Sequence, residues 1–463
     1  MRKRAGLLNA AQETISLKAL QSLQLRKLRA VVKYAAAQSP LYKKKLSPKD
    51  ARLGSLEDVA RLPLTAKADL LASDPYENLC VPREEVAEVH FSSGTSASPV
   101  PSFLTRKDIK EGSAYLARTW HMQGVRRESV FAMFASYGLF SAGLINHYAL
   151  QRIGAFVVPA GNASATKAFE LLKEFEADSC AAVASYYLYL IAMAKEHGID
   201  LKKQHLTHLT AGGEPFSEKQ RRFIEKAFGA TLYDQYGLCE INTGLAGECS
   251  EKDGLHLLAD YAYPEIIDPE TLQQLPDGRE GELVLTTFHK EASPLIRYRT
   301  GDITSITHAP CPCGRTSPRI ARVKRRVVDT IFYKGLKIER PHVARMLENM
   351  GAHINPHLWQ IEAATAAGRD ELVLKVLLVA KRGGADHVAG HMRTHLGVRV
   401  KVVSFTDEEF ARKLRRQVVA LLQVHRSFCH QFRNNDICIQ SLQRHRRMIC
   451  FHIHSGCARH RSQ

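Results

Sequence analysis

Apolar residues in the N-terminal segment recur at a spacing that predicts a helix. Within residues 15–45, the apolar positions that share one helical face, with lysines and arginines between them, are Leu17, Leu20, Leu28, Val31 and Val32. Gln24 interrupts this stripe, and the Ser39-Pro40 step is typical of a helix end. We therefore expect an amphipathic helix that ends at the proline.

Short apolar runs and helical patterns alternate between residues 88 and 240. The runs that predict buried strands are Val130–Phe134, Phe156–Val158, Cys180–Ala184, Leu206–Leu209 and Thr231–Tyr233. Helical patterns over Ala163–Phe175 and Glu218–Phe228 lie between them. Strands that alternate with helices predict an α/β protein whose sheets are layered and mostly parallel.

The pattern changes towards the C-terminus. Residues 255–305 contain the strand pattern Glu282–Thr287 and several proline turns, which indicates a β-rich subdomain. Beyond them, strand patterns at Val327–Tyr333 and Leu372–Ala380 and helical stretches at 341–350 and 385–396 indicate a small α+β domain. We therefore expect a large N-terminal domain over residues 1–325, a small mobile C-terminal domain over 326–416, and an irregular basic Cys/His-rich tail over 417–463.

The net charge of the chain is unevenly distributed. The 463 residues carry a formal net charge of +18, and +10 of it falls from residue 411 onward, where eleven basic residues face one acid, Asp436. The rest has an ordinary basic excess, so nucleic-acid binding is a minor alternative that would act through the tail. No apolar run is long enough for a membrane-spanning helix, and the N-terminus lacks the apolar region of a signal peptide. We expect a cytoplasmic protein.

One serine- and glycine-rich loop is suited to binding phosphate. It comprises Ser92, Ser93, Gly94, Thr95 and Ser96. Small hydroxyl residues around a glycine leave backbone N–H groups and hydroxyls free to surround phosphate oxygens. The segment lacks the Gly-Lys-Ser/Thr of a Walker motif, and an ordinary loop is the alternative.

Three further motifs carry candidate chemistry, and the first two follow predicted strands. They are Gly213-Glu214-Pro215, the stretch that contains Tyr236, Gly237 and Glu240, and Asp302 after a Thr-Gly turn. Ligands of α/β sheets bind at the carboxyl ends of parallel strands. There Tyr236 could stack on a base and Glu240 could hold a cation. Asp302, an acid after a Thr-Gly turn, could accept hydrogen bonds from ribose hydroxyls. The alternative is a tight turn with a structural glutamate.

In this order and spacing, the four motifs resemble the adenylate-forming superfamily, and more closely its phenylacetate–CoA ligase branch. Supporting stretches are Ser39–Tyr42, Leu62–Lys67, Tyr137–Phe140, Asp277–Leu283 and Cys311–Arg315. The resemblance covers residues 15 to 415 and implies a two-step reaction. A carboxylic acid attacks the α-phosphate of ATP, giving an acyl-adenylate and pyrophosphate, and coenzyme A then displaces AMP. Mg²⁺ would offset the charge on the phosphates.

The resemblance also implies a role for each matching residue. Ser92–Ser96 would hold the phosphates; Gly213, Glu214 and Pro215 would line the adenine site with Tyr236 and Gly237. Glu240 would serve Mg²⁺, Asp302 the ribose, and Tyr137, Gly138 and Phe140 the acyl pocket. The hinge of the small domain would lie near Arg325-Arg326, with Arg326 at the nucleotide. Lys413 is the candidate for the late lysine that promotes adenylation.

The chain departs from the family pattern at several of these positions. Ala97 and Ser98 stand where relatives have glycine and a cation, and the glycine expected before Lys413 is missing. Two alternatives therefore stay open, namely an adenylyltransferase that acts without coenzyme A and a degenerate nucleotide-binding protein that has lost turnover. The sequence favours an aryl or arylacetic acid, but it does not identify the acid or the oligomeric state, a homodimer included.

Two pairs of metal-binding side chains lie far apart in the sequence. Cys249 and His256 form one pair, and Cys311 and Cys313 the other, both flanked by turn residues. Three thiolates and one imidazole complete a tetrahedral zinc site. We therefore expect a structural Zn²⁺ that joins the β-rich subdomain to the loop before the hinge, with unconnected free thiols as the alternative.

Overall fold

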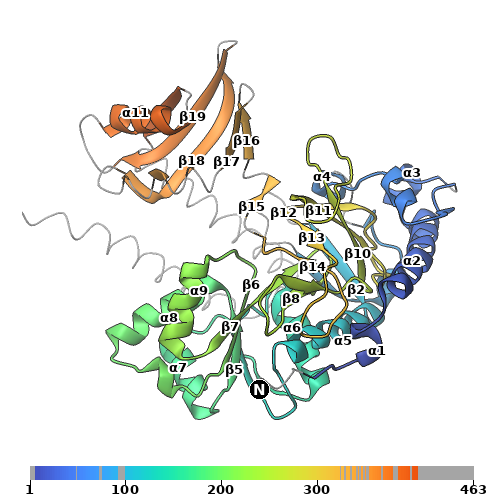
Figure 1. Cartoon of the computed structure of the whole chain (residues 1–463), viewed down its shortest axis with the longest axis horizontal. Coiled ribbons are helices and arrows are strands. Elements are labelled where there is room, and N and C mark those ends of the chain that lie inside the picture. Colours follow the sequence, from blue (N-terminus) through green and yellow to red (C-terminus); the bar gives the residue numbers. More distant parts are fainter. Residues whose placement is uncertain are drawn as a thin grey trace, which may run out of the picture. The chain divides into compact units, whose positions relative to one another are not determined.

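The structure, a computed structural model, separates into two units, Met1–Thr330 and Ile331–Gln463, and each is described by itself (Figure 1). The predicted phosphate loop, Lys413 and the 417–463 tail lie outside the described residues. The described residues are 6–47, 49–71, 74, 76–91, 100–323, 325–327, 330–333, 336–339, 343, 346–347, 350, 354–366, 369–378, 384–396 and 399–404.

A nine-stranded mixed sheet forms the centre of the first unit. Its order is β13 (Ile306–Thr307), β14 (Arg319–Ile320), β9 (Leu255–Leu257), β8 (Thr243–Glu248), β7 (Thr231–Leu238), β6 (His208–Gly212), β5 (Ser179–Ala182), β3 (Val130–Met133) and β4 (Phe156–Val158). The strands from β4 to β7 are parallel neighbours, whereas β7, β8, β9, β14 and β13 pair antiparallel. This confirms the predicted α/β class.

Helices cover both faces of the parallel strands, as the alternation of side chains in β3 shows. Phe131 and Met133 belong to a core with α5 (Arg106–Met122) and α6 (Ser141–Ile153). Ala132, between them, belongs to the core with α7, α8 and α9, because successive strand residues point to opposite faces. In Figure 1 these three helices lie together, and their bounds are Ala165–Glu174, Ala184–Glu196 and Glu218–Phe228.

The β-rich subdomain is an antiparallel sheet next to the N-terminal helices. Its order is β10 (Ala262–Ile267), β11 (Gly281–Thr287), β12 (Tyr298–Thr304) and β15 (Arg325–Arg326). The predicted helix is α2 (Leu17–Gln38), which ends before Pro40, and α3 (Pro40–Lys45) follows it. Gln24 is buried in the apolar stripe because its Nε2 donates to the carbonyl of Ala259 at 2.9 Å.

A two-stranded hairpin flanks the predicted phosphate loop. Strands β1 (Val86–Phe91) and β2 (Pro101–Thr105) pair antiparallel, with Phe91 opposite Pro101. Thr105 then caps α5 through a capping box with Asp108. Phe91 and Pro101, on either side of segment 92–99, are therefore held next to each other. Further short α-helices that the structure describes in this unit are α1 (Ala10–Glu13) and α4 (Lys67–Leu71).

The described elements of the second unit include a hairpin, a three-stranded sheet and a helix with defined bounds, and Val343, Met346 and Leu347, within the predicted helix 341–350, are also helical. The hairpin pairs β16 (Thr330–Tyr333) with β17 (Leu336–Glu339), and the sheet order is β18 (Ile354–Ala366), β19 (Arg369–Leu378) and β20 (Val400–Ser404). Helix α11 (Gly384–Leu396) matches the predicted helix 385–396. The sequence pattern did not predict β18, and β16 begins three residues after the predicted Val327.

Arg297 joins the β-rich sheet to the N-terminal segment through a buried ion pair. Its Nη2 and Nε donate to Glu265 at 2.8 and 3.1 Å, and its Nη1 donates to the carbonyls of Ala60 and Leu62 at 2.8 and 2.7 Å. We expect Arg297→Met to lower the free energy of unfolding by about 3–5 kcal/mol, because it leaves Glu265 as a buried unpaired charge. Urea unfolding measures this change.

The matched control is Arg61→Met, since Arg61 pairs with Asp58 at 2.7 Å while its own side chain is 70% exposed. Such exposed pairs contribute about 0–1 kcal/mol. Equal small losses in both variants would contradict the structural role of Arg297.

Candidate functional site

The loops after two neighbouring parallel strands lie at one edge of the large sheet. Gly212 at the end of β6 is opposite Gln235 in β7. A Cβ atom at Gly212 would lie 2.9 Å from the Gln235 carbonyl oxygen, and Gly213 has a φ of +83°, so both positions favour glycine. The Glu214 carboxylate accepts a hydrogen bond from the Ser185 N–H. The Gly213-Glu214-Pro215 motif is thus fixed beside β7.

Tyr236, Asp302 and Arg326 form one hydrogen-bonded cluster. The Tyr236 hydroxyl donates to Asp302 Oδ2 at 2.7 Å, and Arg326 Nε donates to Asp302 Oδ1 at 2.6 Å. Burial and the neighbouring Asp302 carboxylate raise the pKa of Tyr236 well above its ordinary value, which keeps the phenol protonated as a donor. The structure therefore brings together three of the predicted nucleotide residues, which come from two different sheets.

Hydrogen bonds within the Thr-Gly turn before Asp302, and from this turn to β11, fix the conformation of the turn. Gly301 has a φ of +74°, and its N–H donates to the Glu282 carboxylate at 3.0 Å. The Thr300 hydroxyl donates to the Leu283 carbonyl at 2.7 Å and accepts from the Asp302 N–H at 3.0 Å. The Asp302 carboxylate is therefore held in one orientation by the Thr-Gly turn that the sequence singled out.

Glu240 lies in the segment after β7 and is tied to β12. The Tyr298 hydroxyl donates to Glu240 Oε1 at 3.2 Å, and the residue is buried. Among the described residues no hydrogen bond uses Oε2, so this oxygen is available to a cation. A carboxylate oxygen is the kind of ligand that Mg²⁺ prefers. Since Tyr298 and Asp302 both belong to β12, the same strand holds the two acidic side chains.

The residues predicted for the acyl pocket lie between β3 and α6. The Tyr137 hydroxyl is 3.1 Å from His147 Nδ1, and Gly138 and Phe140 follow in the same segment. The Leu139 carbonyl accepts from the Phe91 N–H at 2.9 Å, which places this segment at the end of β1.

The start of α6 also contacts the segment that carries Glu240. Ser141, the first residue of the helix, donates through its hydroxyl to Cys239 Sγ at 3.5 Å. The acyl-pocket segment therefore adjoins the residues beside the phosphate loop and beside Glu240, while its role in binding an acid stays a prediction.

The structure adds two residues that the sequence analysis missed. Arg322 donates to Asp234 Oδ2 at 2.6 Å and to the Phe216 carbonyl at 2.8 Å. These contacts tie β7 to the segment between β6 and α9. Lys290 is buried, and burial lowers its pKa to about 8. The sequence analysis missed both residues because neither belongs to a motif, and a single basic residue has no periodicity that would predict its burial.

Four metal-ligating side chains converge at the far edge of the large sheet. Sulfur or nitrogen atoms of Cys249, His256, Cys311 and Cys313 all lie within 4.8 Å of one another. Cys249 follows β8, His256 lies in β9, and the two later cysteines lie between β13 and β14. The predicted cluster is confirmed as an arrangement that could bind a metal ion.

The contacts within the cluster suit a metal. Cys313 Sγ is 3.3 Å from His256 Nε2, and Cys249 Sγ is 3.8 Å from Cys311 Sγ, too far for a disulfide. His256 Nδ1 is 3.1 Å from the Ser317 hydroxyl, a second contact that orients the ring as in metal sites. Hydrogen bonds from Cys249 and His256 hold the pKa of Cys313 well below its ordinary value, which favours the thiolate needed for ligation.

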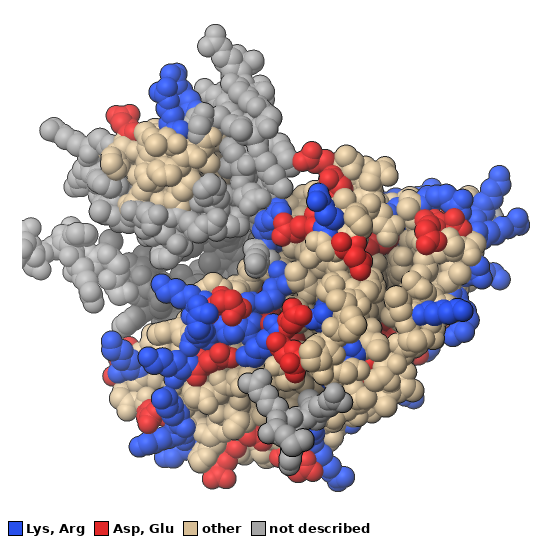
Figure 2. All heavy atoms as spheres, viewed as in Figure 1, with Lys and Arg blue, Asp and Glu red and all other residues tan. Residues whose placement is uncertain are grey.

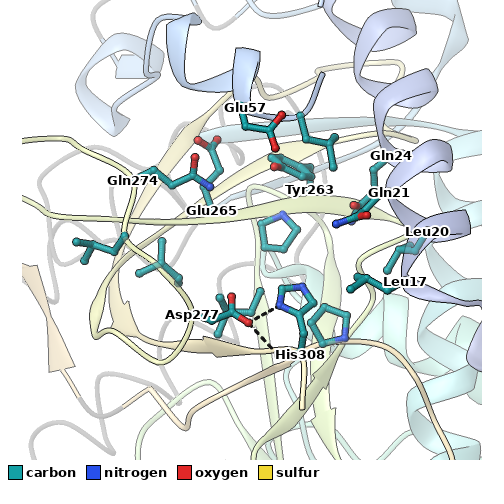
Figure 3. Close-up of a pocket in the computed structure, with 16 residues that line it drawn as sticks. Leu17, Leu20, Gln21, Gln24, Glu57, Tyr263, Glu265, Gln274, Asp277 and His308 are labelled. Carbon is teal, nitrogen blue, oxygen red and sulfur yellow. Dashed lines mark hydrogen bonds and ion pairs between the residues drawn. The ribbon is translucent and has the colours of Figure 1, made fainter. Parts of the chain in front are cut away.

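A separate cavity of about 170 Å³ lies in the β-rich subdomain (Figure 3). Its walls include Leu20 and Gln24 of α2 and Tyr263 of β10, and the Asp277–His308 pair, 2.7 Å apart, lies at one side. None of the described nucleotide-motif residues lines it. The cavity is therefore distinct from the candidate nucleotide site.

Basic and acidic side chains are interspersed on the face of the first unit seen in Figure 2. Elsewhere in the first unit, Arg322 also pairs with Glu218, and Arg325 pairs with Glu280 at 2.7 Å. The basic tail lies outside the described residues. Of the helices that the structure describes, none combines the length and the hydropathy of a membrane span.

Comparison with known proteins places the chain in a family. Residues 7–288 match the AMP-binding enzyme family. A phenylacetate-coenzyme A ligase of Aromatoleum evansii is 35% identical over 401 residues, which cover 83% of this chain and 89% of that protein. The corresponding protein of Pseudomonas putida is 38% identical over 331 residues, or 70% and 75% of the two chains.

A crystal structure shares the fold. It is a 2-hydroxyisobutyryl-CoA ligase in complex with 2-HIB-AMP and CoA in the thioesterification state, with a TM-score of 0.68 and 25% identity, covering 90% of this chain and 95% of that chain. The similarity extends over most of the length of both chains, so it is not confined to the short motifs. The chain therefore belongs to the AMP-binding enzyme family, within its phenylacetate-coenzyme A ligase branch.

Proposed function

We propose that this protein activates a carboxylic acid with ATP and transfers the acyl group to coenzyme A. The carboxylate attacks the α-phosphate of ATP, pyrophosphate leaves, and the coenzyme A thiol then displaces AMP from the acyl-adenylate. The observation that carries the proposal is the Tyr236–Asp302–Arg326 cluster at the carboxyl end of a parallel strand. Family membership supports the same reaction.

Each residue of the candidate nucleotide site has a proposed task. Asp302 would accept hydrogen bonds from the ribose hydroxyls, and the Gly213-Glu214-Pro215 loop and Tyr236 would border the adenine. Glu240 would hold Mg²⁺, which when bound offsets charge on the phosphates. Ser92–Ser96 would surround these phosphates, and Lys413 would promote adenylation. These last roles rest on the sequence resemblance, because both segments lie outside the described residues.

We propose an aryl or arylacetic acid as the substrate. The named relatives are phenylacetate-coenzyme A ligases, and the segment of Tyr137 and Phe140 adjoins both the hairpin and Cys239. The proposal includes a hinge near Arg325-Arg326, since the division between the two units falls after Thr330. It also includes a structural Zn²⁺ held by Cys249, His256, Cys311 and Cys313.

ATP–pyrophosphate exchange with a panel of acids tests this function. We expect exchange with phenylacetate or a related aryl acid to exceed exchange with short aliphatic and hydroxy acids by at least about 10-fold, since a lost ring contact costs a few kcal/mol. Adding coenzyme A should then release AMP and form the thioester. Exchange without thioester formation would favour the adenylyltransferase, and bound nucleotide without exchange would favour the degenerate protein.

A further inference from the structure

Lys290 places a buried ammonium group between three segments of the candidate site. Its side chain is 3% exposed; Nζ donates to the Glu240 carbonyl at 2.5 Å and to the Ser102 hydroxyl at 2.7 Å. The Ser102 hydroxyl is also 3.5 Å from the same carbonyl. One side chain therefore joins its own loop, the β1–β2 hairpin and the segment that carries Glu240.

The loop around this ammonium is anchored on each side. The preceding residue, His289, is 2.5 Å from Glu111 Oε2 through its Nδ1. After the lysine, the N–H groups of Glu291 and Ala292 donate to the two oxygens of Asp108 at 2.7 and 3.0 Å. Fixed neighbours hold a side chain in one geometry, so the ammonium is oriented before any ligand arrives.

Among the residues that the structure describes, no acid forms a direct ion pair with Lys290. Its two hydrogen-bond partners are neutral oxygens, while the carboxylates of Asp108 and Glu240 act on it only at longer range. An ammonium buried in this way is costly unless a compensating charge is available. Residues 92–99, which connect the two strands of the hairpin, contain no lysine or arginine. Lys290 is thus a buried cation held against β2, the strand that follows this segment without basic residues.

We propose that Lys290 is a positioning residue for the adenylation half-reaction. Its ammonium fixes β2, through Ser102, against the segment of Glu240, so that the proposed Mg²⁺ ligand is held in one position when the triphosphate binds. This proposal rests on the proposed function. It predicts a selective effect, because the second half-reaction starts after pyrophosphate has left and needs no triphosphate to be positioned.

The test compares the two half-reactions in Lys290→Met, which keeps the length of the side chain but removes its charge and both hydrogen bonds. We expect ATP–pyrophosphate exchange to fall roughly 100-fold, the effect of a misplacement near 1 Å. The rate of thioester formation from the chemically synthesised adenylate of the best panel acid should change less than about threefold. This step involves no triphosphate, so the variant loses no interaction that its transition state needs. Calorimetry should show that the affinity for Mg-ATP falls and the affinity for AMP does not.

The matched control is Lys107→Met, since Lys107 pairs with Glu291 of the same loop at 2.7 Å but is 60% exposed; its exchange rate should stay close to that of the original protein. Ser102→Ala removes one of the two contacts and should show the same selectivity with a smaller loss, even if Lys290→Met does not fold. Equal losses in both half-reactions, or no loss of exchange in Lys290→Met and Ser102→Ala, would overturn the proposal. Absence of exchange in the unaltered protein would instead overturn the proposed function.

Discussion

Replacing Asp302 with alanine should lower the rate of ATP–pyrophosphate exchange about 1,000-fold. A hydrogen bond to a charged acceptor contributes roughly 2 kcal/mol, and the carboxylate would accept one from each ribose hydroxyl. Losing about 4 kcal/mol of binding that persists into the transition state corresponds to about three powers of ten in rate. The affinity for AMP, measured by calorimetry, should fall by a similar factor, because AMP carries the same ribose.

The fold should tolerate this substitution. Asp302 is 4% exposed, but its partner Arg326 has a side chain that is 48% exposed and can turn towards water. Thermal unfolding of the variant checks this point.

The matched control is Asp277→Asn, which alters an acid of the β-rich subdomain paired with His308 at 2.7 Å beside the separate cavity. Retained AMP binding in Asp302→Ala, or an equal loss in the control, would contradict the ribose role.

The strands of the large sheet were predictable from local patterns, because buried parallel strands are short apolar runs. Phe156–Val158 matches β4, and Thr231–Tyr233 begins β7 at the predicted residue. Helix α8 was not predicted, because its sequence from Ala184 to Glu196 is apolar on most sides and shows no clear period, although the structure buries only Ala184, Tyr187, Leu190 and Ala194.

The candidate site was predictable in its motifs and not in its contacts. Tyr236 and Asp302 are 66 residues apart and lie in different sheets, so the sequence contains no local signal for their 2.7 Å hydrogen bond. The position of Lys290 depends entirely on tertiary contacts with Ser102 and Glu240. The cysteine and histidine pairs could be predicted, because few tasks other than metal ligation require that set between turn residues.

Removing two thiolates of the Cys/His cluster should remove the metal and weaken the fold. Protein purified without a His tag should contain about one zinc per chain, as a four-ligand structural site requires. Cys311→Ser combined with Cys313→Ser should reduce this content to near zero and lower the free energy of unfolding by about 4 kcal/mol, the stabilisation given by a ligand present at a thousand times its Kd. Metal analysis and urea unfolding measure the two effects.

In the double variant, the loss of structure should be limited to the cluster's own loop and to the N-terminal segment that contacts it. Arg315, two residues after Cys313, donates through Nε to Glu13 at 2.7 Å, and the Thr316 N–H donates to the Glu13 carbonyl at 3.0 Å. Both contacts depend on the loop that the metal would fix, so hydrogen exchange should accelerate in α1 and in residues 311–316.

The cluster and the nucleotide residues share no described hydrogen bond. Exchange of pyrophosphate should therefore persist in the double variant at temperatures where it stays folded. Cys80→Ser, which alters a half-buried thiol outside the cluster, is the control and should keep both the zinc and the stability. If the unaltered protein, grown with added zinc, contains none, the four side chains are free thiols and an imidazole, and the contacts of Glu13 must hold the loop unaided.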